Sequence, residues 1–148
     1  MSIFDDVLQS GQFEEQPFGP HEAYAGILLA SSACDGHIAD EEVQGLVTIL
    51  GRTRLYQHVT PQRFGSMIDR LLGVLKRGGP EQLVQKSVPV VPSELKETVF
   101  INACDIVLAD GVVENDEKEF INDLMIKLEI PAERAKQIIQ VLVYKNQG

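Results

Sequence analysis

Positive charge is scarce in this chain, and so are other features that mark common functional classes. The sequence holds 13 Lys and Arg residues against 22 Asp and Glu residues, which gives a formal net charge of −9. A nucleic-acid surface needs concentrated positive charge, so we exclude nucleic acid as a main partner. The apolar runs are far shorter than a membrane span, and residues 1–6 lack the basic head and apolar stretch of a secretory signal. We therefore expect a cytoplasmic protein.

Cysteine is also scarce, and the usual catalytic signatures are missing. The two cysteines, Cys34 and Cys104, lie in apolar stretches, and no Cys-x-x-Cys or His-x-x-x-His pair suggests a zinc site. We expect reduced core thiols rather than a disulfide or a metal pair. No nucleophile–base pair or glycine-rich phosphate loop is recognisable, so we expect a non-enzymatic protein without an organic cofactor. The enzyme alternative is a metal-dependent hydrolase.

Alternation of apolar and polar residues with the period of a β-strand is almost absent, whereas apolar residues recur at helical spacing. At 148 residues the chain is long enough for one domain with a proper core. We therefore predict an all-α, single-domain bundle of six to seven helices. The expected helices cover about residues 20–34, 39–50, 61–77, 80–87, 94–109, 115–128 and the stretch from 131 onward.

Two segments are expected to lie outside the bundle helices. Residues 1–19 form an arm and linker with one or two amphipathic turns, which we interpret as a loosely docked arm or, alternatively, a partner or membrane-surface anchor. Residues 88–92 read Val-Pro-Val-Val-Pro, which predicts an extended connector, with a short buried strand as the alternative. Ser93 is expected to cap the next helix.

One acidic motif occurs twice. Residues 35–42 read Asp-Gly-His-Ile-Ala-Asp-Glu-Glu, and residues 110–117 read Asp-Gly-Val-Val-Glu-Asn-Asp-Glu, at an offset of 75 residues (110 − 35 = 75). The apolar residues that follow each motif keep the offset of 75 residues. Further along the chain the offset falls to 70, so the first copy has five more residues (75 − 70 = 5) after its second helix. At that offset Ile68, Leu71 and Leu72 align with Ile138, Val141 and Leu142.

The duplication predicts two three-helix repeats. The first covers about residues 21–78 and the second about 94–147, joined by a spacer at 79–93, within a helical domain of residues 20–148. We expect a pseudo-twofold axis to relate them and to bring the two acidic loops together.

The loops carry the candidate metal chemistry. Their spacing resembles the second half of an EF-hand calcium loop, but the positions that supply the earlier ligands of an EF-hand are mostly apolar here, so we reject a standard EF-hand. Two interpretations stay open: the acids complement helix N-termini and face solvent, or they bind divalent cations, calcium or magnesium rather than zinc. For His37 we favour a solvated loop residue over a ligand. The candidate ligands are Asp35, Asp40, Glu42, Asp110, Glu114 and Glu117.

The sequence resembles the TerB-like tellurite-resistance family. Residues 33–42 and 107–117 carry the match, and the resemblance covers most of residues 20–147. The same fold occurs at the front of a membrane-anchored DnaJ-type co-chaperone. The resemblance implies an all-α bundle whose acidic residues, at Asp35, Glu42, Asp110 and Glu117, chelate metal. It also implies a bacterial stress-response role tied to tellurite, with other stress-response proteins or the inner membrane face as partners.

A departure from the family pattern lies at Ala39, where a capping Ser or Asp is usual, so we expect Asp40 to take that role.

Basic residues suggest a competing function. Residues 51–79 hold six basic residues and one acid, which predicts a dipolar molecule. The competing function is a helical adaptor that docks proteins or anionic lipid through this region. Its candidate residues are Arg52, Arg63 and Arg70. Nothing in the sequence indicates an oligomeric state.

Overall fold

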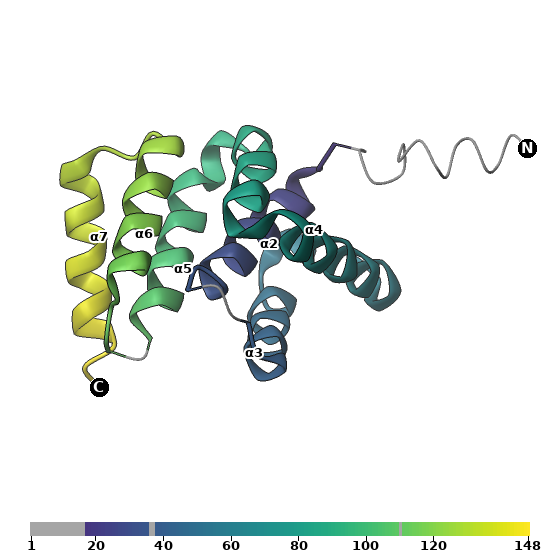
Figure 1. Cartoon of the computed structure of the whole chain (residues 1–148), viewed down its shortest axis with the longest axis horizontal. Coiled ribbons are helices and arrows are strands. Elements are labelled where there is room, and N and C mark those ends of the chain that lie inside the picture. The colour runs from purple at the N-terminus through teal and green to yellow at the C-terminus, as the bar shows by residue number, and fades with distance from the viewer. Residues whose placement is uncertain (1–16, 36–37, 110) are drawn as a thin grey trace, which may run out of the picture.

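A computed structural model describes residues 17–35, 38–109 and 111–148, and its elements are labelled in Figure 1. These residues form α-helices and short 3-10 turns and contain no strand, which confirms the all-α prediction. The 3-10 turns cover Arg54–Tyr56, Val88–Val90 and Ser93–Leu95. The helices are α2 (Pro20–Ser32), α3 (Asp40–Gly51), α4 (Pro61–Ser87), α5 (Lys96–Leu108), α6 (Asn115–Lys127) and α7 (Ala132–Lys145).

Helix α2 forms the centre of the molecule. Its residues are apolar on nearly every side, and every residue from 23 to 31 is buried. A helix that is apolar all round is stable in water only if other elements cover it. Helix α4 packs on one side of α2 and helix α5 packs on another, so α2 lies between α4 and α5 (Figure 1).

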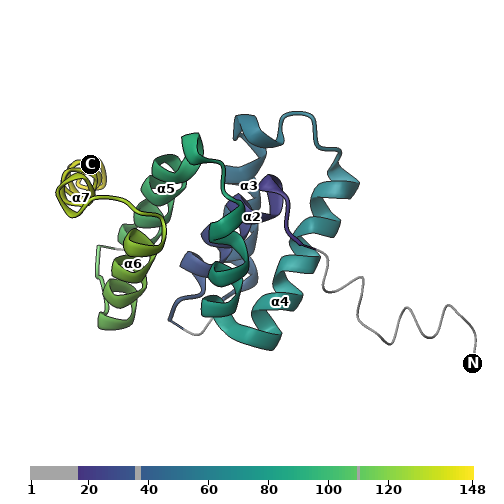
Figure 2. The ribbon, with the colours of Figure 1, turned by 90° about the horizontal axis from the view of Figure 1, so that it is seen from above.

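Helix α4 is bent into two arms. Gly79 has a φ of 77°, which is outside the helical region, and Pro80 follows it. The predicted third helix and the predicted short helix over 80–87 are therefore the two arms of one kinked element, which Figure 2 shows as a V. The second arm lies so close to α2 that a Cβ on Gly26 would lie 2.5 Å from Ser87 Oγ.

The connection between α4 and α5 differs from the prediction. The residues expected to be an extended connector include a 3-10 turn, Val88–Val90, and the alternative of a buried strand is wrong. The fixed φ of Pro89 suits the first turn of a helix, and a lone strand here has no neighbour to complete its hydrogen bonds. Ser93 does not cap α5, because it begins a further 3-10 turn that leaves Leu95 at the N-cap position.

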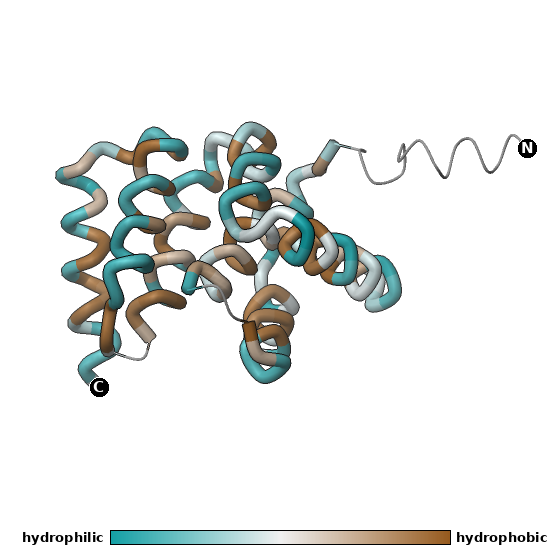
Figure 3. Tube along the Cα trace, viewed as in Figure 1, coloured by the Kyte–Doolittle hydropathy of each residue, from teal (hydrophilic) through white to brown (hydrophobic). Residues whose placement is uncertain are grey.

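Helices α6 and α7 both pack on α5, at one edge of the molecule (Figures 1 and 2). Apolar and hydrophilic residues alternate with the turns of α7 (Figure 3), and only one side of this helix is covered. Val143 is 42% exposed for this reason. Within the described residues, no helix combines the length and apolarity needed to cross a membrane.

Candidate functional site

Three of the predicted acidic ligands line one hollow. Asp35 follows α2, Glu42 lies in the first turn of α3 and Glu117 lies in the first turn of α6. The hollow has a volume of about 430 Å³. Side chains from both acidic loops therefore border the same space. The other lining residues are Ser31, Ser32, Gly45, Leu46, Ile49, Asp105, Ile106 and Ala109.

Two of the other predicted ligands lie elsewhere. Asp40 and Glu114 are exposed and do not line this hollow. Asp110 and His37 lie outside the described residues. The expectation that Asp40 caps α3 is wrong, because Ala39 has the extended conformation of an N-cap residue and Asp40 is already the first helical residue. Without a side-chain cap, the three acids that begin α3 still complement its dipole.

Local backbone chemistry fixes Glu117. Gly111 has a φ of 79°, a conformation that favours glycine, and it lets the chain turn after α5. The backbone N–H of Glu114 then donates to Glu117 Oε1 at 3.0 Å. This bond is half of a capping box, and it holds the Glu117 carboxylate in place through one of its two oxygens.

Asp105 is a fourth carboxylate in the hollow and was not among the predicted ligands. It accepts hydrogen bonds from Lys145 Nζ at 2.7 Å and Asn146 Nδ2 at 3.0 Å. Partial burial acts to raise the pKa of Asp105, but these two hydrogen bonds and the charge of Lys145 outweigh it, so the pKa is lowered. Asp105 therefore stays ionised and already has a cation. The sequence signal was its position slightly more than one helical turn before the second loop.

Cys34 reports the electrostatics between the two loops. Burial, followed by the charges of Glu117, Asp35 and Asp116, raises the pKa of this thiol to about 11. Burial, followed by the charge of Asp105, raises the pKa of Cys104 to about 12. Both cysteines are free thiols, and Cys34 is only partly buried. Thiols that titrate this high are neutral near pH 7 and are poor nucleophiles or metal ligands.

The oxygen donors of this hollow suit a hard cation that keeps part of its water shell, rather than an ion enclosed by protein ligands on all sides. Within residues 17–35, 38–109 and 111–148, no three Asp, Glu, His or Cys side chains are placed to hold one metal ion. The carboxylates border an open hollow instead. Magnesium commonly keeps several waters and binds through one or two carboxylates, and calcium also accepts waters among its oxygen ligands. Carboxylate oxygens and waters are ligands of these hard cations, whereas a structural zinc site uses four Cys or His ligands.

A second acidic hollow lies where α6 faces the bend of α4. Its volume is about 320 Å³, and Cys34 lies on its wall. The repeated motif does not indicate this hollow, because part of its charge comes from the middle of a helix, outside the motif. Its acidic residues are Glu81, Asp116, Glu119 and Asp123.

The predicted basic residues divide into two groups. Arg63 and Arg70 line a shallow hollow of about 340 Å³ on α4, which also includes Glu22. The Arg70 guanidinium lies 3.8 Å from Glu22 Oε1 and 5.0 Å from the centre of the Phe18 ring, so it already has partners. Arg52 follows α3, is exposed and does not line that hollow.

No family profile, curated protein or solved structure matched this chain.

Proposed function

We propose that this chain is a non-enzymatic protein that binds calcium or magnesium in the hollow between its two acidic loops. The observation that carries the proposal is that Asp35 and Glu42 from one loop and Glu117 from the other line the same space. Carboxylates brought together raise each other's free energy, and a divalent cation relieves this repulsion. The oxygen donors favour a hard cation, and the open geometry predicts weak, water-bridged binding.

The stress-response role, with tellurite and related oxyanions as the trigger, rests on the resemblance to the TerB-like family. The two motifs that carry it differ in their environment. In the first loop Cys34 is partly buried between the carboxylates, whereas in the second loop Ala109 is exposed. The Cys34 thiol is neutral near pH 7, so it gives no support for direct thiol chemistry on an oxyanion. Cation binding is therefore the part of the proposal that the site supports.

Thermal unfolding with and without the ion tests the proposal. At ten times its dissociation constant, an ion that binds only the folded chain stabilises it by about 1.4 kcal/mol. For a domain of this size the melting temperature should rise by about 4 °C. Asp35→Asn with Glu117→Gln should abolish the rise. Gln at position 117 keeps an oxygen to accept the Glu114 N–H, so the start of α6 is preserved.

Glu41→Gln is the matched control. Glu41 is exposed in the same helical turn as Glu42 but does not line the hollow, so its replacement should leave the rise unchanged. The proposal fails if calcium or magnesium raises the melting temperature of the double variant as much as that of the Glu41 variant. Binding would then be a general surface effect.

A second candidate is docking to an anionic surface through α4. Arg63 supports it, because its side chain is exposed and lines the shallow hollow, whereas Arg70 is held by Glu22 and Phe18. Arg63→Glu should reduce sedimentation with phosphatidylserine vesicles at low salt, and Arg52→Glu should have a smaller effect. Equal sedimentation of the unchanged protein, Arg63→Glu and Arg52→Glu would rule out this candidate function.

A further inference from the structure

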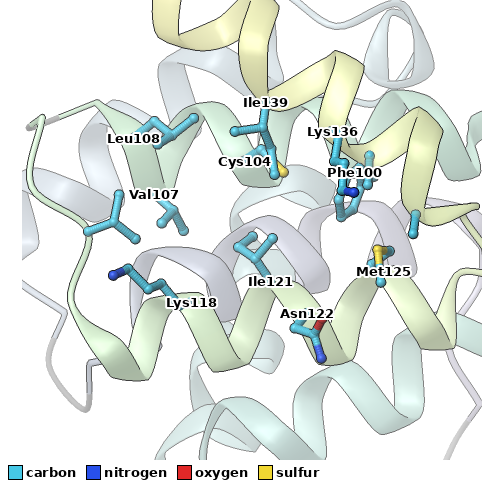
Figure 4. Close-up of a pocket in the computed structure, with 13 residues that line it drawn as sticks. Phe100, Cys104, Val107, Leu108, Lys118, Ile121, Asn122, Met125, Lys136 and Ile139 are labelled. Atoms are coloured by element: carbon cyan, nitrogen blue, oxygen red, sulfur yellow. The ribbon is translucent and has the colours of Figure 1, made fainter.

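An apolar hollow lies between α5, α6 and α7. Its volume is about 450 Å³, within the range of small-molecule sites. Helix α5 forms its floor, and α6 and α7 pack on α5 without closing over it (Figure 4). The lining residues are Phe100, Cys104, Val107, Leu108, Val113, Lys118, Ile121, Asn122, Met125, Ala132, Ala135, Lys136 and Ile139.

Both ends of this trough are bounded by the chain. Val113 lies in the connection from α5 to α6, and Ala132 is the first residue of α7, directly after the connection from α6. The floor runs from Phe100 to Leu108, which is about 12 Å of helix. A long partner helix would have to pass over both connections, whereas a short flexible hydrocarbon fits between them.

The charge of the trough is opposite to that of the molecule. Lys118 and Lys136 line it, and none of the lining residues that the structure describes is acidic, although the chain carries a net charge of −9. In Figure 4 Lys118 lies on the Val107 side of the opening and Lys136 beside Phe100. Lys136 has an exposed partner, Glu133, at 3.5 Å. Among the described residues, Lys118 has no carboxylate within ion-pairing distance.

We propose that this trough binds a medium-chain carboxylate amphiphile, with its hydrocarbon along α5 and its carboxylate at Lys118. Apolar walls with few placed polar groups are the usual composition of such a site. The amine of Lys118 selects the ionised head, and the side chains of Val107, Ile121 and Met125 receive the chain. This site is separate from the cation hollow, so either proposal can fail without the other.

Calorimetric titration with fatty acids below their micelle concentrations tests the proposal. Octanoate and decanoate should bind at one site, and each added methylene should strengthen binding about four-fold. Decanol, which has the same chain without the charge, should bind more weakly than decanoate. Lys118→Gln should reduce decanoate affinity about five-fold and leave decanol affinity unchanged. Lys127→Gln is the control, because Lys127 is exposed on the same helix outside the trough.

The reaction rate of the Cys104 thiol, which lines the trough, provides a second test of binding. The chain has two cysteines, so Cys34→Ser leaves Cys104 as its single thiol. Bound decanoate should slow the reaction of Cys104 with a disulfide reagent, whereas partial unfolding by the amphiphile would accelerate it. Ile121→Ala, which enlarges the trough without adding charge, should keep the preference for decanoate over decanol.

Three results would overturn the proposal. In the first, decanoate gives no saturable binding. In the second, decanol binds as tightly as decanoate, with no change in Lys118→Gln. In the third, decanoate binds only after removal of residues 1–16, which would identify the chain's own N-terminal residues as the occupant.

Discussion

Helices α2–α4 and helices α5–α7 are two successive sets of three helices. The last helix of each set is buried to a different extent by the rest of the molecule. Leu71 in α4 is fully buried, whereas Val141 in α7, its partner in the sequence alignment, is 65% exposed. Helix α4 packs against the central α2 with both of its arms, whereas α7 contacts α5 from the edge. Equal apolar spacing therefore does not guarantee equal burial, because spacing defines a face and the surrounding elements decide whether it is covered.

The connection from α3 to α4 is longer than the connection from α6 to α7. It includes a 3-10 turn, in which the Tyr56 ring packs edge-on against Tyr24 and Phe64. The Tyr56 hydroxyl donates to the backbone oxygen of His21 at 2.8 Å. The shorter connection between α6 and α7 has no such turn, and the apolar trough lies beside it.

The largest effect should come from removing equivalent side chains in the two halves. Leu71→Ala should lower the free energy of unfolding by about 2–5 kcal/mol, because it leaves a cavity against α2. Val141→Ala should change it by no more than about 0.5 kcal/mol, because the side chain is mostly in water. Urea denaturation of both variants measures this difference. Similar losses would mean that α7 is buried as deeply as α4.

A smaller effect should come from adding one methyl group to a glycine. Gly26→Ala should destabilise the fold by about 1–3 kcal/mol, because its Cβ would meet Ser87 Oγ and Leu83 Cδ1. Gly65→Ala, in α4, has open space around its Cβ and should stabilise by about 0.5–1 kcal/mol through helix propensity. The two melting temperatures should move in opposite directions. If Gly26→Ala is neutral, the second arm of α4 does not pack closely on α2.

The C-terminal half should show a still smaller, pH-dependent contribution. The folded-state pKa of Asp105 is lowered, so its stabilisation is present above the unfolded-state pKa near 4 and is lost as the pH falls through the folded-state value. Asp105→Asn should cost about 0.2–1 kcal/mol at pH 7, because Lys145 is 57% exposed and screened by water. The cost should shrink as the pH falls below 4. An unchanged difference between pH 7 and pH 3 would contradict the ion pair.

The sequence predicted most of the helices because each one carries apolar residues at helical spacing. The Thr60 hydroxyl accepts the Arg63 N–H as an N-cap, and Gly111 has a positive φ in the turn after α5. The sequence did not predict that Gly79 and Pro80 join two helices into one bent element, because a break and a kink share the same residues. The two-repeat origin stays a prediction.

The candidate site was predictable only in part. The Asp-Gly motif identified Asp35, Glu42 and Glu117, which line one hollow, but it also included Asp40 and Glu114, which do not. Consecutive acids in a helix point in different directions, and their final direction depends on the start of the helix, here at Ala39 rather than at a side-chain cap. The Asp105–Lys145 pair joins residues 40 apart, a contact that no local pattern indicates.

Titration calorimetry with calcium and magnesium is the most direct test of a shared cation site between the two halves. Metal-stripped protein should give one saturable binding event, with a dissociation constant on the order of 1 mM for an open, water-bridged site. Asp35→Asn, which changes the first loop alone, and Glu117→Gln, which changes the second alone, should each weaken it. A flat response to both ions, or identical binding curves for the unchanged protein and both variants, would contradict the account.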